Sequence, residues 1–253
     1  LSAIGSADAA NQHRVRLIQL WRHMISDGLV HDNLPERILP RDRDARRRER
    51  LSLDQYAAIF AEARPAIRNA MELSLNALQR RGDVARWRFD WQDEGHAHVI
   101  QSKTRRHGPS AWLRIPLHLP AAHSEAGDVT LEQILARCRR DGIACPFVIH
   151  ERPSRIRKSA GKEHPFQLTP AAISRGFADA RDRAGICAGL DPERRPTFHE
   201  LLSLGQHLRA GQGWTREQIR ALRGHTSAAM TEHYQEGHTW TDIQVPAGES
   251  FST

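Results

Sequence analysis

The residues best suited to chemistry gather in the C-terminal part of the chain and end at Tyr234. This tyrosine is one of only two in 253 residues. His199 and His225 precede it, and several arginines lie between them. A phenol can attack a phosphodiester when nearby groups take its proton and neutralise the charge on the phosphoryl oxygens. These residue types indicate a tyrosine nucleophile that acts on a phosphate ester.

The composition favours a polyanionic partner. The formal net charge is +7, from 37 basic and 30 acidic side chains. Such a balance is typical of proteins that bind nucleic acid, although a solvated basic surface has the same composition. Only Lys103, Lys158 and Lys162 are lysines. Lysine, unlike arginine, can release its proton at a useful pH, so Lys103 is a candidate proton donor.

Several other classes are disfavoured. No apolar run is long enough to cross a bilayer, so we expect no membrane partner. The three cysteines show no CxxC spacing, which argues against a zinc or disulfide framework and favours a reducing cytosol. His96 and His98 could bind a metal, but beside a predicted turn they are expected to be exposed polar residues. We therefore expect neither a metal nor a cofactor. The chain starts at Leu1 rather than Met, which suggests a truncated N-terminus.

Capping residues and hydrophobic spacing predict helices over most of the chain. Three capping boxes, each a serine or threonine three positions before a glutamine, predict helix starts at Ser52, Thr130 and Thr215. Tyr56 lies in the first of these helices, on its apolar face, and is expected in the core. Prolines predict two more starts, at Pro65 and Pro170. Helical spacing predicts further helices over 14–26, 198–209 and 227–234.

Alternation of apolar and polar residues predicts a few short strands. They are expected at 87–91, 96–101, 111–116 and 240–245, with a short buried strand at 147–149. Lys103 lies on or beside the hairpin turn that joins the second and third of these. The fold class that follows is α+β, a mainly helical domain with a small antiparallel β-sheet.

Five motifs together resemble those of the tyrosine recombinases, and of phage lambda-type integrases in particular. They are Gln79-Arg80-Arg81-Gly82-Asp83, Gln101-Ser102-Lys103-Thr104, Thr197-Phe198-His199-Glu200-Leu201, Gly224-His225 and, nine residues later, Tyr234. Each motif is weak alone, because an isolated arginine or histidine is usually a surface or structural residue. Their common order and spacing, over about residues 50–245, carry the resemblance.

The resemblance implies the chemistry of the N-terminal motifs and of the nucleophile. Tyr234 would form a 3′-phosphotyrosine bond with DNA. Arg80 would clamp the scissile phosphate, and Asp83 would brace the site. Lys103 would protonate the leaving 5′ oxygen.

It also implies roles for the histidine motifs. His199 would act as a base or hydrogen-bond to the phosphate, with Glu200 as a supporting residue. His225 would donate to a phosphoryl oxygen. Basic residues of the linker and loops would contact the DNA backbone, namely Arg46, Arg47, Arg48, Arg105, Arg106, Arg155, Arg157 and Lys158.

One position departs from the family pattern. Leu202 stands three residues after His199, where the pattern has a second arginine that would make a two-pronged hydrogen bond to the scissile phosphate. Leucine offers neither a donor nor a charge, so we expect slow or undetectable cleavage. Two arginines could replace the missing one: Arg209, two turns along the same helix, and Arg81, beside Arg80.

The resemblance also suggests domains and partners. Residues 1–30 resemble the end of a core-binding domain, 31–50 a basic linker, and 51–253 the catalytic domain with a tail at 235–253. The tail strand is expected to pair with a neighbouring protomer or with its own sheet. The implied partners are double-stranded attachment sites, three further protomers in a tetramer on DNA, and DNA-bending or excision proteins, in the bacterial cytoplasm at the nucleoid.

Three functions stay open. The chain could be a site-specific recombinase, a DNA-binding protein of the same fold that cleaves poorly, or a tyrosine-type topoisomerase.

Overall fold

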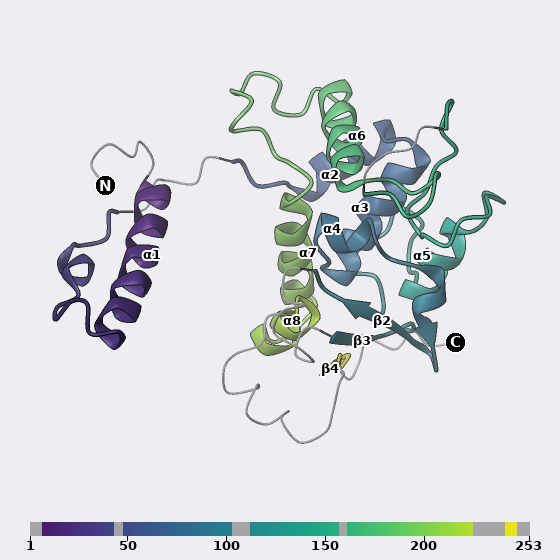
Figure 1. The fold of residues 1–253 in the computed structure, drawn as a ribbon. Coiled ribbons are helices and arrows are strands. Elements are labelled where there is room, and N and C mark those ends of the chain that lie inside the picture. Colours follow the sequence, from purple (N-terminus) through teal and green to yellow (C-terminus); the bar gives the residue numbers. More distant parts are fainter. Residues whose placement is uncertain (1–6, 43–47, 103–111, 157–160, 225–240, 247–253) are drawn as a thin grey trace. The chain divides into compact units, whose positions relative to one another are not determined.

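The computed structural model describes residues 7–42, 48–102, 112–156, 161–224 and 241–246, and the chain divides into two compact units, Leu1–Glu49 and Arg50–Thr253 (Figure 1). In the first unit, helix α1 (Ala7–Ser26) is followed by a 3-10 helix, η1 (Leu34–Arg37). The Asn33 amide donates to the carbonyl of Ile18 over 3.2 Å, and η1 packs against α1. Part of the segment expected to be a linker is therefore folded onto α1.

The second unit contains most of the predicted helices. They are α2 (Leu53–Glu62), α3 (Pro65–Ala77), α4 (Arg81–Val84), α5 (Leu131–Cys138), α6 (Pro170–Arg183), α7 (Glu200–Gly211) and α8 (Arg216–Leu222). All three predicted capping boxes are present, at the starts of α2, α5 and α8. Pro65 and Pro170 begin α3 and α6, where the missing N–H of proline costs no hydrogen bond. The helix expected at 227–234 lies outside the described residues.

Helix α3 is the centre of this unit. It packs against α5, α6 and α7, and nearly all of its side chains are buried. A methyl group added at Gly205 of α7 would lie 2.2 Å from the carbonyl oxygen of Leu75, so the two helix backbones touch there. This contact fixes the position of α7 relative to the C-terminal end of α3.

A four-stranded sheet lies beside the helices, in the order β1 (Gln92–Asp93), β2 (His96–Ile100), β3 (Trp112–Pro116) and β4 (Thr241–Asp242) (Figure 1). The first three strands are antiparallel, as expected for a hairpin. Strand β4 runs parallel to β3, with Leu113 opposite Thr241. The α+β class is confirmed, but the sheet is mixed rather than wholly antiparallel, because β4 pairs in parallel with β3.

The strand predicted at 87–91 is wrong: only Arg88 pairs there, in a single isolated bridge with Phe147. Phe89 donates to the carbonyl of Pro146, Val148 donates to that of Trp87, and the chain then turns into the 3-10 helix η2 (Phe89–Trp91). The alternation arises because Trp87 and Phe89 point into the core, not because the backbone continues as a strand. The short strand expected at 147–149 is likewise only the other side of this bridge.

Candidate active site

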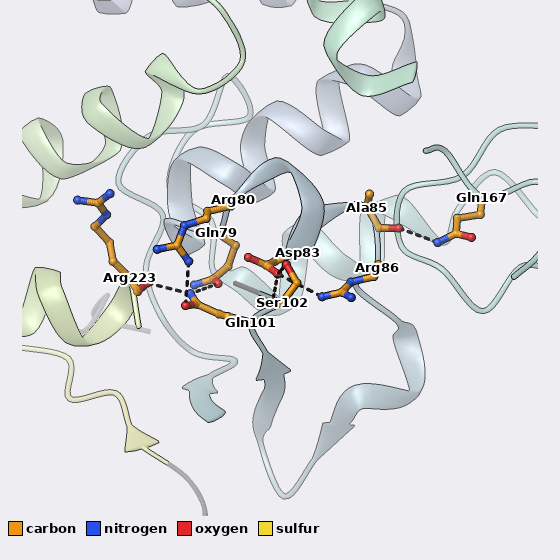
Figure 2. Close-up of polar contacts among 9 residues, drawn as sticks. All are labelled: Gln79, Arg80, Asp83, Ala85, Arg86, Gln101, Ser102, Gln167 and Arg223. Atoms are coloured by element: carbon orange, nitrogen blue, oxygen red, sulfur yellow. Dashed lines mark hydrogen bonds and ion pairs between the residues drawn. The ribbon is translucent and has the colours of Figure 1, made fainter. Parts of the chain in front are cut away.

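Arg80 lies at the turn between α3 and α4. Its backbone is extended, with φ −68° and ψ 152°, and its side chain is half-buried. Leu78, at φ 52°, ends α3 in a left-handed conformation and so directs the chain into this turn. One guanidinium nitrogen of Arg80, Nη1, donates to Oε1 of Gln101 over 3.1 Å (Figure 2).

Gln101 joins three parts of the fold at the end of β2. Its Nε2 donates to Oε1 of Gln79 over 2.6 Å and to the backbone carbonyl of Arg223 over 2.9 Å. Gln79 in turn donates to the carbonyl of Leu222 over 2.8 Å. Both glutamines are fully buried, so these bonds are shielded from water. In the sequence both glutamines are recognisable only as parts of motifs, and no local pattern predicts this role.

Gly224 makes the approach of α8 to Gln101 possible. Its φ is +65°, a left-handed conformation that side chains disfavour. A Cβ there would stand 2.2 Å from Oε1 of Gln101. Only glycine fits both the conformation and the space, and His225 follows directly in the sequence.

Asp83 restrains the same end of β2, one residue beyond Gln101. Its buried carboxylate accepts hydrogen bonds from the backbone N–H and the hydroxyl of Ser102, at 2.8 and 2.9 Å (Figure 2). Arg86 lies 3.4 Å from the same oxygen. These contacts fix the residue immediately before Lys103.

Leu202 and its neighbours lie at the start of α7. His199 is exposed at the N-terminal cap position, whereas Leu202 is only 2% exposed and packs in the hydrophobic core. The Glu200 side chain is buried, and its carboxylate lies 3.7 Å from the guanidinium of Arg50. Leu202 therefore contributes packing, and no side-chain hydrogen-bond donor, to this region.

Both arginines that could replace the missing one make contacts elsewhere. Arg209 is fully buried, donates to the carbonyls of Asn76 and Pro120, and stacks on the ring of Trp214 at 4.8 Å. The role of Arg209 is structural, and Trp214 is a buried packing residue. Arg81 turns the other way and donates to the hydroxyl of Ser174 on α6.

Arg223 is the residue that sequence reasoning missed. Its Nη1 donates to Oε1 of Gln206 over 3.0 Å, and Gln206 donates to the carbonyl of Leu202 over 2.8 Å. Burial lowers the pKa of the Arg223 guanidinium, and the positive charge of Arg80 lowers it further. The available signal was its place directly before Gly224-His225.

Only one of the two tyrosines is described, and it is a core residue as predicted. Tyr56 is fully buried on α2. Burial raises the pKa of its phenol well above the usual value, and the charge of Glu72 raises it further. A phenol in this environment is a poor nucleophile, which leaves Tyr234 as the candidate.

Many predicted site residues lie outside the described residues. These are Lys103, His225, Tyr234, Arg46, Arg47, Arg105, Arg106, Arg157 and Lys158. Of the predicted DNA contacts, Arg48 and Arg155 are described, and both are exposed. Within the described ranges, no three histidine, cysteine, aspartate or glutamate side chains are grouped to hold a metal, and no helix has the length and apolarity to span a membrane.

Comparison with known proteins places the chain in a family. No family model matches it. It is 32% identical over 248 residues to the integrase of Escherichia phage HK022, an alignment that covers 96% of this chain and 62% of the phage protein. The chain thus spans about three fifths of the length of that relative.

Two solved structures have the same fold. One is a phage lambda integrase dimer bound to a core site, with 26% identity, a TM-score of 0.66, and coverage of 88% of this chain and 74% of that one. The other is a lambda integrase tetramer bound to a Holliday junction, with 27% identity, a TM-score of 0.65, and coverage of 88% and 60%. The chain belongs to the phage integrase family of tyrosine recombinases.

Proposed function

We propose that this chain breaks and rejoins DNA at specific sites through a 3′-phosphotyrosine intermediate on Tyr234. The observation that supports this most is the cluster in which Gln101 joins Arg80 to the backbone of Arg223. The cluster lies two residues from Lys103 and two residues from His225. Residues of two motifs, and the residue that directly precedes a third, thus converge at one place, as a phosphodiester site requires.

The proposed cleavage step is a phosphoryl transfer. The phenol oxygen of Tyr234 attacks phosphorus while the bond from phosphorus to the 5′ oxygen breaks. The phenol proton passes to His199 as base, and Lys103 gives a proton to the leaving 5′ oxygen. Arg80 and His225 donate to the phosphoryl oxygens, where charge develops. The new ester conserves the energy of the broken bond, so a 5′ hydroxyl can reverse the step without a nucleotide cofactor.

The supporting residues fit this scheme. Asp83 restrains Ser102, the residue that precedes Lys103 in the sequence. Glu200 pairs with Arg50 beside His199. Leu202 contributes no hydrogen-bond donor. Its presence alone would make cleavage of the DNA slower than with an arginine at this position.

The proposed partners follow from the relatives. The lambda proteins are bound to a core site as a dimer and to a Holliday junction as a tetramer. For this chain we propose double-stranded attachment sites and a tetramer on DNA. Arg48 and Arg155 would contact the DNA backbone, together with the predicted basic residues outside the described ranges. DNA-bending or excision proteins would assist at the bacterial nucleoid in the cytoplasm.

Covalent capture tests the proposal and selects the target sequence in the same experiment. The purified chain is incubated with a pool of duplexes of random sequence, each carrying a nick, and then denatured in detergent. Cleavage a few nucleotides from a nick releases a short piece with a 5′ hydroxyl, which traps the protein on the DNA. We expect sequence-enriched DNA joined to Tyr234 through its 3′ phosphate, located by mass spectrometry.

The controls separate the three functions. Tyr234→Phe must abolish the adduct, and an adduct on Tyr56 contradicts the proposal. A protein that only binds DNA shifts it in a native gel but forms no detergent-stable adduct. A topoisomerase relaxes a supercoiled plasmid that lacks the enriched sequence, whereas a site-specific recombinase leaves that plasmid supercoiled.

A further inference from the structure

The proposed function requires a second positive group on the scissile phosphate, and Leu202 does not supply it. Its side chain is buried in the core, and its backbone carbonyl accepts from Gln206. Arg209 is committed to two carbonyls and to Trp214, and Arg81 to Ser174. A guanidinium for this task must come from another element.

Arg223 reaches the same face of α7 from the end of α8. Gln206 lies one helical turn after Leu202, so the two side chains are on one face. The Arg223 guanidinium donates to Oε1 of Gln206 over 3.0 Å and therefore lies beside the turn that begins at Leu202. The bond from Gln101 to the Arg223 carbonyl fixes the backbone on the other side. Figure 2 shows Gln101 between Arg80 and the Arg223 backbone.

The charge of Arg223 lacks a counter-charge among the described residues. No carboxylate there lies within ion-pair distance of its guanidinium, and its side-chain partner is the neutral amide of Gln206. Burial and the positive charge of Arg80 both disfavour this cation. An anion near both arginines would remove that penalty, because two half-buried cations attract a negative group more strongly than either does alone.

Structural arginines in this fold look different. Arg209 is fully buried with two carbonyl acceptors, and Arg181 pairs with Asp182 and donates to the carbonyl of Pro196. Among the residues that the structure describes, the Arg223 guanidinium has one neutral acceptor, which leaves most of its five N–H groups for a ligand. The surroundings of Arg223 are therefore those of an anion-binding residue rather than of a residue that holds helices together.

We propose that Arg223 supplies the second guanidinium of the phosphate clamp, donating to a non-bridging oxygen of the scissile phosphodiester in place of the arginine that position 202 lacks. This rests on the proposed function, since the ligand is the phosphate that Tyr234 attacks. The expected consequence is that the chain cleaves DNA despite Leu202.

The first test compares two arginines of the same region. Arg220 is exposed on α8 and serves as the control, because its substitution by alanine removes the same charge as Arg223→Ala. With protein in excess over nicked DNA, Arg223→Ala should lower the rate of adduct formation by about 10²–10³, as for loss of an oxyanion donor. Arg220→Ala should change it by less than about threefold, a factor that corresponds to under 1 kcal/mol. Circular dichroism and thermal unfolding report whether each variant folds.

The second test separates phosphate contact from a structural role. A methylphosphonate at the scissile position replaces a charged oxygen by a neutral methyl group, so there is less charge to neutralise. Arg223→Ala and the charge-conserving Arg223→Lys should then lose much less rate relative to the unsubstituted protein than they do on the phosphodiester. A structural defect would reduce both substrates equally, and Arg223→Lys guards against a misfolded alanine variant.

The outcomes are distinct. If the unsubstituted chain forms the adduct and Arg223→Ala forms it as fast as Arg220→Ala, the role of Arg223 is wrong while the proposed function stands. If Arg223→Ala loses the same factor in rate on the methylphosphonate as on the phosphodiester, the role of Arg223 is also wrong. If the unsubstituted chain forms no adduct with any DNA, the proposed function fails, and the Arg223 proposal fails with it.

Discussion

At the scale of single residues, the site depends on how closely backbone and side chains approach at Gly224. The Gln101 side chain that a Cβ at Gly224 would strike makes hydrogen bonds to Arg80, to Gln79 and to the Arg223 carbonyl. Gln101 cannot withdraw from an added methyl group without breaking some of these bonds. The glycine thus controls the placement of the Arg80 side chain and of the Arg223 backbone.

Gly224→Ala should therefore impair the site beyond the backbone strain that it introduces. The left-handed conformation alone costs alanine about 1–2 kcal/mol. Gly213→Ala is a matched control, because Gly213 has φ +86° and nothing within 4 Å of an added Cβ. We expect Gly224→Ala to lower the free energy of unfolding more than Gly213→Ala does, and to reduce adduct formation at least about tenfold. Equal effects of the two variants on both measurements would contradict the account of Gln101.

At the scale of elements, the sequence predicts what is encoded locally. The three capping boxes each lie within four consecutive residues, and all three helices begin where expected. The bond from Gln79 to the Leu222 carbonyl joins residues 143 positions apart, so no local pattern predicts it. Position 202 shows the same limit, because the pattern indicates a missing arginine but not Arg223, which reaches that face of α7 from another helix.

The alternation at 87–91 failed for a related reason. Burial of Trp87 and Phe89 produces the alternating pattern of a strand. A strand also needs a neighbouring strand to pair with, and the described residues supply only the single bridge between Arg88 and Phe147. The alternation at 240–245 predicted a strand but did not decide whether it pairs with the chain's own sheet or with a neighbouring protomer. The structure has β4 on the chain's own β3, with Thr241 and Ile243 buried.

Removing β4 should expose this sheet edge. Truncation after residue 240 removes Ile243, whose burial stabilises the fold by about 1.5–3 kcal/mol. Truncation after residue 246 keeps the strand and serves as the control. We expect urea unfolding to show the loss only in the shorter protein, together with altered assembly on DNA. If the shorter protein unfolds and assembles like the control, the tail contributes neither stability nor assembly.

At the scale of the whole molecule, the charge of the chain and the chemistry of its site agree. In the proposed function a net charge of +7 would attract DNA over the surface, and Arg80, Arg223 and Lys103 would place positive groups at one phosphate. In a metal-dependent nuclease, by contrast, the ion polarises the phosphate and activates water. Here side-chain cations and a tyrosine would perform both tasks, so the reaction should conserve the phosphate ester without a divalent ion.

Chelation of divalent metals tests this division of labour. In excess EDTA, adduct formation on the enriched nicked DNA should stay within about twofold of its rate in magnesium, because guanidinium and ammonium groups neutralise the phosphate. A magnesium-dependent restriction endonuclease in the same buffer confirms that chelation is complete. The product should carry a 5′ hydroxyl on one side and the protein on the other, which distinguishes transfer to tyrosine from hydrolysis. If EDTA abolishes the adduct and magnesium restores it, a metal ion rather than Arg223 and Lys103 neutralises the scissile phosphate.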